Sequence, residues 1–305
     1  MQYDILTLGD YFFDQIFSGL PRFPVLGCET YADELVTTGG GMYITVATLS
    51  RLGARVGWPA YFGCDYYSKF VRDLARCRDI DLSLAQVADH PFRRVTTSIP
   101  YGGERAFVTF ADPIPEDWRT HWLNSLDQCD FRHLHLGGWT STPELRPLAD
   151  KAHAKGATVS MDCQDVRCLL EPPTCMGPLS LVDVFLPNAR EALIITETTD
   201  IESALHQLMP QVEVAVIKDG ANGAWAGRRG EIVHAPAVSV GPLVDTTGAG
   251  DCFNAGFLFG YIVEKAPLAK CLQYGNICGG FSVTGVGGAT CAPDYAELLA
   301  WAEKP

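Results

Sequence analysis

The chain has 305 residues, of which 47% are hydrophobic and 19% charged, and this composition predicts a globular protein with a large core. Its formal net charge of −13 argues against a nucleic-acid partner, because phosphate backbones need clustered Lys and Arg. No apolar run approaches the ~20 residues of a membrane span, and the N-terminus MQYDILTLGD has no signal-peptide pattern, so we expect a cytoplasmic protein without a membrane partner.

Short strand-like runs alternate with helical patterns along most of the chain. The predicted strands are YDILTLGD (3–10), RVGWPAYFG (55–63), FRHLHLGG (131–138), ATVSMD (157–162), LVDVFLPN (181–188) and VEVAVIKDG (212–220). The predicted helices lie at 42–53, 67–77, 143–155, 189–195, 201–209, 251–264, 267–284 and 294–302. This βαβ alternation predicts an α/β fold: a three-layer, doubly wound, mostly parallel sheet within a single domain, 1–305.

Two segments interrupt that alternation. Residues 11–38 and 93–110 carry the strand-like runs YADELVTT and RRVTTSIPYGGERAFVTF, and the second predicts a hairpin that turns at Gly102 and Gly103. Neither run is typical of a parallel sheet. We therefore expect a small β-sheet lid, inserted in the α/β domain and covering the site from one side.

The stretch DTTGAGDCFNAGFLFG at 245–260 is the best candidate for phosphate binding. Gly248, Ala249 and Gly250 leave the backbone accessible at the start of an apolar helix, where free N–H groups and the helix dipole can hold an anion. Asp251 follows directly, either as a helix cap or as a proton acceptor beside the anion. The chain has no G-x-x-x-x-G-K-[ST] loop and no G-x-G-x-x-G after its first strand, which disfavours a nicotinamide-dependent oxidoreductase.

Further polar residues follow the predicted strands. Ligands of open α/β sheets bind at these carboxyl ends, where the loops converge. The residues in question are Asp10, Asp14, Gly137 to Trp139, Asp162, Asn188, and Lys218 to Gly220. An acidic protein can still bind an anionic ligand there, because local dipoles and a metal ion can hold a phosphate.

Four motifs together resemble one known family. DTTGAGD at 245–251 resembles the C-terminal signature of the ribokinase-like (PfkB) carbohydrate kinases, and TGGGMYITVATLSRLGARVGWPAYFGCD at 38–65 resembles their N-terminal glycine-pair segment. LPNAREA at 186–192 is similar to their N-x-x-E motif, and VIKDGANGAW at 216–225 to their nucleotide-loop strand. The motifs occur in the family's order over nearly the whole chain, so the resemblance implies a ribokinase-like fold.

The resemblance implies ATP-dependent phosphorylation of a hydroxyl group on a sugar or related small molecule. Phosphoryl transfer needs mainly positioning and charge stabilisation from the protein. The backbone N–H groups of Gly248, Ala249, Gly250 and Asp251 would form an anion hole for the transferring group. Asp251 would accept the proton of the attacking hydroxyl group.

The resemblance also implies a nucleotide and a metal ion. Asn188 and Glu191 would help to hold Mg²⁺ near the phosphates, although without the neighbouring motifs they would suit a helix cap and a solvated helix residue. Lys218 would contact an ATP phosphate or remain a solvent-exposed charge at a strand end. Gly220 and Gly223 would let the nucleotide approach the backbone, although lone glycines after a strand also suit simple turns.

Two further features follow from the resemblance alone. Asn276 falls where family members line the adenine pocket. Family members often bind K⁺ near the anion hole, here through Asp245, Thr247 and backbone carbonyls around 283–288, and the sequence does not distinguish this ion site from an empty turn.

The substrate side matches the family less closely. Asp14 would hydrogen-bond sugar hydroxyls, Gly40 and Gly41 would bring backbone amides to the substrate, and Arg167 would contact an acidic group or pair with an acid. Ile44 stands where the family usually has Asn, and an apolar side chain cannot replace the hydrogen bonds of that Asn. The substrate is therefore presented differently, or it is not an ordinary sugar.

The acceptor thus remains open between two kinds of molecule. A fructose-, ribose- or sugar-acid-type acceptor is favoured, and a nucleoside is the alternative. Aromatic residues near the expected site would suit a nucleoside base or form part of the core: Tyr11, Phe12, Phe13, Tyr43 and Trp139. A catalytically weak regulatory relative on the same fold is the competing class. The exposed β lid also suggests a homodimer.

Overall fold

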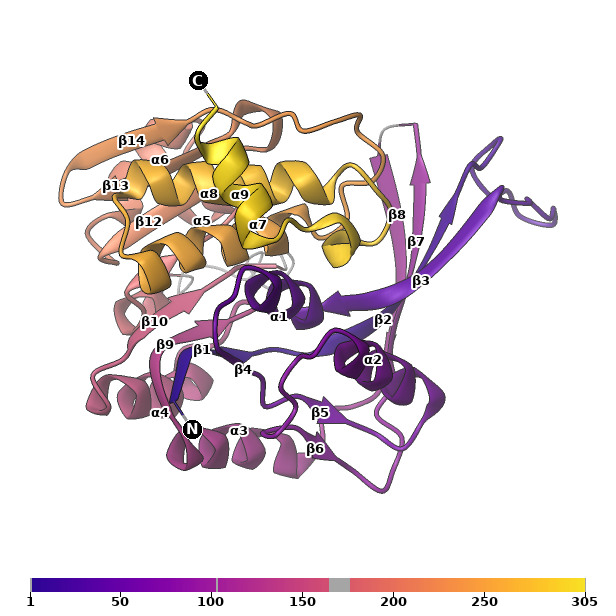
Figure 1. Cartoon of the computed structure of the whole chain (residues 1–305), viewed down its shortest axis with the longest axis horizontal. Helices are drawn as coiled ribbons and strands as arrows, with labels where there is room; N and C mark the ends of the chain where they lie inside the picture. The colour runs from indigo at the N-terminus through magenta and orange to yellow at the C-terminus, as the bar shows by residue number, and fades with distance from the viewer. Residues whose placement is uncertain (1, 103, 165–175, 305) are drawn as a thin grey trace.

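The computed structural model describes residues 2–102, 104–164 and 176–304. An eight-stranded sheet runs through the molecule in the order β14-β13-β12-β11-β10-β9-β1-β4 (Figure 1). Its strands are β1 (Gln2–Leu8), β4 (Val56–Gly57), β9 (Asp130–Leu136), β10 (Thr158–Met161), β11 (Val184–Phe185), β12 (Val214–Lys218), β13 (Ala224–Arg228) and β14 (Glu231–Ala235). From β12 to β4 every pairing is parallel, while β13 and β14 join antiparallel.

Helices cover both faces of this sheet. The central strands are buried on both sides, as the continuous apolar run of β12 shows. Helices α1, α7 and α8 pack together on one face, and α4 to α6 lie on the other (Figure 1). The helices are α1 (Met42–Arg51), α2 (Tyr66–Cys77), α3 (Glu116–Gln128), α4 (Thr142–Ala154), α5 (Ala189–Thr196), α6 (Ile201–Leu208), α7 (Ala249–Leu258), α8 (Leu268–Ser282) and α9 (Tyr295–Ala302).

Three local differences separate this fold from the sequence prediction. The single strand predicted over 55–63 is two short strands, β4 and β5 (Tyr61–Phe62), because Pro59 interrupts the ladder, and β5 pairs with β6 (Gln86–Val87) instead. Helix α3 was not predicted, although Trp118, Trp122 and Leu126 recur at helical spacing on its buried side. The edge hairpin β13–β14 was also missed.

The predicted lid is a separate four-stranded sheet with the order β3-β2-β7-β8. It comprises β2 (Tyr11–Ser18), β3 (Glu34–Gly41), β7 (Arg94–Tyr101) and β8 (Glu104–Ala111). In Figure 1 these strands project from the side of the main sheet, next to the loops that precede α7. Helix α2 covers one side of the lid's base, where Phe13 packs against Tyr67 and Phe70.

The connections change direction between β1 and β9. The chain leaves β1 towards β4 on one side and leaves β9 towards β10 on the other. Such a switch point is where open α/β sheets bind ligands, at the carboxyl ends of the strands. Among the described residues, no helix has the length and apolar character needed to cross a membrane.

Candidate active site

The first turn of α7 is built to accept an anion. Gly248 is the N-cap with a φ of 73°, and a side chain there would collide with Ile44 Cδ1 at 2.7 Å and Gly288 Cα at 2.9 Å. Within the described chain, the N–H groups of Gly250 and Asp251 have no hydrogen-bond acceptor, whereas Ala249 N–H donates to the Thr246 carbonyl. Two free donors therefore point out at the positive end of the helix dipole.

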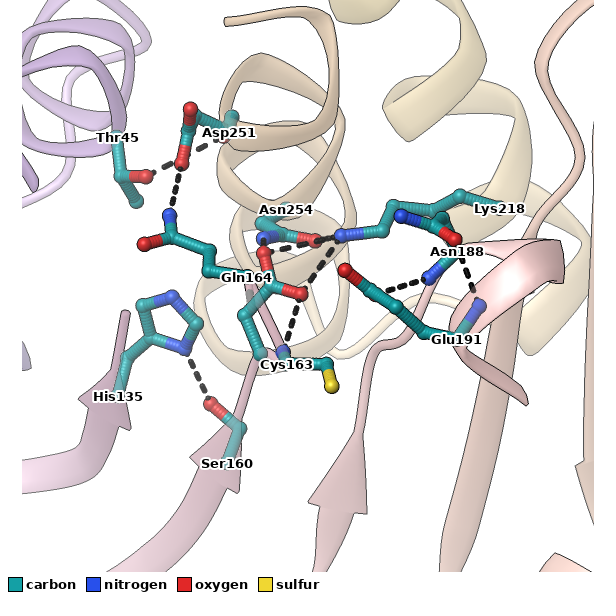
Figure 2. A network of polar contacts seen from close by, with 11 residues as sticks. Thr45, His135, Ser160, Cys163, Gln164, Asn188, Glu191, Lys218, Asp251 and Asn254 are labelled. Atoms are coloured by element: carbon teal, nitrogen blue, oxygen red, sulfur yellow. Dashed lines mark hydrogen bonds and ion pairs between the residues drawn. The ribbon is translucent and has the colours of Figure 1, made fainter. Parts of the chain in front are cut away.

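Asp251 is not a helix cap. No side chain caps α7, and the partly exposed Asp251 carboxylate instead accepts a hydrogen bond of 2.9 Å from Gln164 Nε2 (Figure 2). Loss of hydration raises the pKa of Asp251 to about 7, and the charges of Asp162 and Asp14 add to this rise, while Lys218 opposes it. An acid with this pKa is half ionised near neutral pH, which suits a general base.

A buried ion pair lies beneath this turn. Lys218 Nζ donates to both oxygens of Asp162 at 3.0 Å and to Asn254 Oδ1 at 3.1 Å, and Asn254 Nδ2 donates back to Asp162 at 2.6 Å (Figure 2). A side chain at Gly250 would lie 3.6 Å from the ammonium. Of the two alternatives that the sequence allowed for Lys218, the solvent-exposed charge at a strand end is therefore wrong.

Asn188 and Glu191 form a capping box at the start of α5. Asn188 Oδ1 accepts from Glu191 N–H at 2.9 Å, and Glu191 Oε2 accepts from Asn188 N–H at 2.8 Å. Glu191 is only 4% exposed, so the alternative that it is a solvated helix residue was wrong. Burial and the nearby Asp162 raise the pKa of Glu191. A buried carboxylate at this position could bind a metal ion or one of its waters.

The lid contributes a buried acid. Asp14 is 7% exposed, and its oxygens fill the space at Gly40, where a side chain would lie 2.0 Å from Oδ2. Gly41 has a φ of 60° and begins α1 behind it. Burial raises the pKa of Asp14 to about 7, and the charge of Asp245 adds to this rise. Asp14 accepts no hydrogen bond from the described residues, which leaves its oxygens for a ligand.

Ile44 is a packing residue. It is 2% exposed on α1, and its side chain occupies the space that side chains at Gly248 and Gly288 would need. An apolar residue here supports the turn before α7 and offers no hydrogen bond to a substrate.

The residues proposed for K⁺ already bind one another. Asp245 accepts from the N–H and hydroxyl of Thr247 at 3.0 and 2.7 Å, and from Gly287 N–H at 3.2 Å. These bonds join the loop before α7 to the loop after α8, and they hold that connection without an ion.

Two of the proposed nucleotide residues have structural roles. Gly223 has a φ of 94°, and a side chain there would lie 2.1 Å from the Ala235 carbonyl, so a tight turn requires glycine. Asn276 Nδ2 donates to the carbonyls of Ala235 and Pro236, both at 2.9 Å. Gly220 is exposed with open space around it.

Most of the aromatic residues suggested for base stacking belong to the core. Tyr11, Phe13 and Tyr43 are at most 4% exposed and belong to the core, and Trp139 packs edge-on against Phe185. Phe12 is half-buried beside Gly41. Arg167 lies outside the described residues.

The structure adds functional candidates that the sequence analysis missed. Gln164 and Asn254 have no local signature, because their partners lie far along the chain. His135 on β9 shares the Ser160 hydroxyl with His133, and its Nε2 has no partner within the described chain. Burial lowers the pKa of His135 to about 4, so its ring is neutral at neutral pH. Two polar residues inside a buried strand, in HLHL, were the available signal.

The two acids make the ligand-free protein sensitive to pH. The folded state raises the pKa of Asp14 and Asp251 from 3.8 to about 7, so it holds protons that the unfolded chain has released between about pH 4 and pH 7. The free energy of unfolding therefore falls as the pH rises through this window. We expect Asp14→Asn to raise the melting temperature by at least about 2 °C at pH 8 and by less at pH 5.

Scanning calorimetry of the ligand-free protein measures this effect. The control Asp33→Asn removes an exposed carboxylate between β2 and β3. An equal gain for Asp14→Asn at both pH values would show that the buried charge is not its cause.

Fold and site together define a class. Asp14 lies on the lid, and Asp251 lies beside the free backbone N–H groups of α7, at the switch point of a doubly wound sheet. This arrangement is typical of an enzyme that transfers a phosphoryl group to a small molecule. The family model "pfkB family carbohydrate kinase" matches residues 22–295. The chain belongs to the PfkB family of carbohydrate kinases, as the sequence motifs predicted.

Individual relatives agree with this assignment. The chain is 36% identical to the acarbose 7(IV)-phosphotransferase of Actinoplanes sp., with 97% of both chains covered. It is 33% identical to the ribokinase of Haemophilus influenzae, with 99% of both covered. The solved structure of Arabidopsis thaliana ribokinase complexed with ribose and ATP superposes with a TM-score of 0.80 at 18% identity over 100% of both chains. The protein is thus an ATP-dependent kinase of the ribokinase-like fold, and its family implies the use of ATP and Mg²⁺.

Proposed function

We propose that the protein transfers the γ-phosphoryl group of ATP to a hydroxyl group of a small sugar or sugar derivative. The acceptor oxygen attacks the γ-phosphorus, the bond from phosphorus to the ADP oxygen breaks, and the acceptor proton passes to the Asp251 carboxylate. The observation that carries the proposal is Asp251, which does not cap α7, has a pKa of about 7 and lies next to two free backbone N–H donors. The N–H groups of Gly250 and Asp251 would stabilise the transferring phosphoryl group.

The acceptor would bind between Asp251 and the lid. The charge of Asp14 raises the pKa of Asp251, which is consistent with an acceptor site between the two acids. On the lid, Asp14 pairs with Thr38 of β3 and with Thr96 of β7, and paired residues share one face of a sheet. Arg105 of β8 reaches the loop before α7, at 3.5 Å from the Thr247 hydroxyl. A polar face of this kind suits an acceptor with several hydroxyl groups.

A sugar is favoured over a nucleoside for a specific reason. Three of the five aromatic residues that would have stacked on a base, Tyr11, Phe13 and Tyr43, are buried in the core, whereas the lid offers an acid and hydroxyl groups. Because Ile44 supplies no hydrogen bond, recognition of hydroxyl groups would rest on the lid strands and on Gly40 and Gly41. The names of the two relatives that are more than 30% identical to the chain, an acarbose phosphotransferase and a ribokinase, also support a carbohydrate acceptor.

The nucleotide side would combine several weaker contributions. Glu191 and Asn188 would hold Mg²⁺ through its waters, and the ion would neutralise phosphate charge. Lys218 would act on the phosphates through the first turn of α7, since its ammonium already binds Asp162 and Asn254. Gly220 would border the nucleotide, and Asp245 and Thr247 would contribute oxygen atoms to a K⁺ site.

The test is ADP formation with Mg²⁺ and K⁺ against a panel of sugars, sugar acids, sugar phosphates and nucleosides. We expect an acceptor-dependent rate with a sugar or sugar derivative. A rate with nucleosides alone would favour the alternative, and binding of ATP without turnover on any member would favour a regulatory relative.

We also propose a homodimer through the lid. Apolar side chains are exposed on its strands and on the loop between β2 and β3: Leu26, Tyr31, Leu35, Val108 and Phe110. Sedimentation velocity tests this directly, and a monomer at micromolar concentration would reject it.

A further inference from the structure

Gln164 contacts the proposed base from a loop on the opposite side of the site. The loop follows β10, and the amide nitrogen of Gln164 donates to Asp251 Oδ1 at 2.9 Å (Figure 2). The two residues are 87 positions apart in the chain. An uncharged amide that reaches across the site to one oxygen of the base is not needed to hold α7 in place, because α7 packs against α1 and α8.

The backbone around Gln164 is firmly held in the position that this contact requires. Asp162 N–H donates to the Leu136 carbonyl at 2.9 Å, and Trp139 N–H donates to the Cys163 carbonyl at 3.0 Å. Gln164 itself has a φ of 52°, a left-handed conformation that residues other than glycine rarely adopt. The neighbouring strand end therefore fixes the direction in which its side chain leaves the loop.

We propose that Gln164 is a positioning residue for phosphoryl transfer, which holds Oδ1 of Asp251 so that Oδ2 faces the acceptor hydroxyl. This inference rests on the proposed function of Asp251. An amide suits the task because it donates a hydrogen bond to the ionised carboxylate without adding a charge.

The charged groups around Asp251 come from several elements. They are Asp162 after β10, Lys218 on β12 and Asp14 on β2, and the neutral His135 on β9 lies within reach of the Asp162 and Lys218 charges. The two acids disfavour the ionised base, whereas Lys218 and the Gln164 amide favour it. Removal of the amide alone leaves the acids opposed only by Lys218, so the base should ionise at higher pH.

The experiment compares Gln164→Met, which keeps the length of the side chain without its donor, with the wild type. The ligand-free protein, labelled with ¹³C at the aspartate carboxyl carbon, is titrated by NMR, and Asp251→Asn identifies the Asp251 resonance. We expect the midpoint for Asp251 to rise by about one pH unit in Gln164→Met. Gln164→Glu replaces the donor by an acid, and it should raise the midpoint further.

The matched control is Gln86→Met. Gln86 Nε2 also donates to an aspartate, Asp117 Oδ2, at 2.9 Å, but this bond joins β6 to α3 away from the site. We expect the Asp251 midpoint to be unchanged in this variant. A midpoint that does not move in Gln164→Met, in a protein whose circular dichroism spectrum is native, would overturn the inference.

A kinetic measurement separates this inference from the proposed function. With Mg-ATP and D-fructose as the probe acceptor, the acid limb of the pH profile of kcat/KM for the acceptor should move with the NMR midpoint, while KM for ATP stays within about twofold. An acid limb that stays in place while the midpoint moves would also overturn the positioning role. Turnover retained in Asp251→Asn would instead reject the base, a result that the titration of Gln164→Met does not depend on.

Discussion

Replacement of Asp251 by Asn is expected to reduce kcat by about 10²–10⁴-fold while binding of ATP is retained. The amide cannot accept the proton of the acceptor hydroxyl, but it is nearly the same size and leaves the N–H groups of Gly250 and Asp251 in place. In the wild type the rate should fall below about pH 7, because the pKa of Asp251 is about 7 and the protonated acid cannot act as a base. Initial rates with the acceptor found in the panel, together with calorimetric titration of Mg-ATP, measure both quantities.

The control for this experiment is Asp294→Asn. Asp294 is the N-cap of α9 and accepts from Glu297 N–H at 2.9 Å, so the variant also removes a negative charge from a helix N-terminus. Because Asn is an equally good cap, turnover should be unchanged. Near-normal turnover in Asp251→Asn would disprove the assignment of the base.

The largest effect on stability is expected from Lys218→Met. Lys218 and Asp162 form an ion pair whose side chains are 11% and 5% exposed. Removal of the ammonium leaves the Asp162 carboxylate buried with Asn254 as its side-chain donor, and breaking such a pair costs about 3–5 kcal/mol. The free energy of unfolding, measured by urea denaturation of the ligand-free protein, should fall by this amount.

Two comparisons isolate the buried charge as the cause. Lys151→Met breaks the exposed pair between Lys151 and Asp127, whose side chains are 37% and 57% exposed, and should cost less than about 1 kcal/mol. The double variant Lys218→Met/Asp162→Asn should recover part of the loss, because the unpaired carboxylate is gone. Equal losses in the two single lysine variants would show that the pair beneath α7 contributes no more than a surface pair.

Much of the fold was predictable from local sequence patterns. Apolar runs of strand length and apolar residues at helical spacing gave correct positions for most of the parallel strands and for eight of the nine labelled helices of the described chain. The lid was predictable because its strands alternate and turn at glycines. Helix α3 carried a helical signal in Trp118, Trp122 and Leu126 that was overlooked, and Pro59 marked the break between β4 and β5.

Some features of the candidate site were also predictable from local sequence, and others were not. The glycine turn at 248–250 and the following Asp251 could be recognised, because the conformation of such a turn depends on the residues within it. The capping box of Asn188 and Glu191 was also a local pattern. The environment of each acid was not predictable from local sequence. Burial sets the pKa of Asp14 and Asp251, and burial depends on how the lid and the helices pack.

Most of the strands and helices, the lid segments and the family were predictable from the sequence, with α3 and the hairpin β13–β14 as the exceptions. These features depend on side-chain periodicity and on glycine and proline positions, which act over a few neighbouring residues. The pairing of Lys218 with Asp162, 56 residues away, and the contact of Gln164 with Asp251 across 87 residues became visible in the folded chain alone. Contacts at such separations form when packed elements bring distant loops together, and no local pattern specifies which polar side chains will then meet.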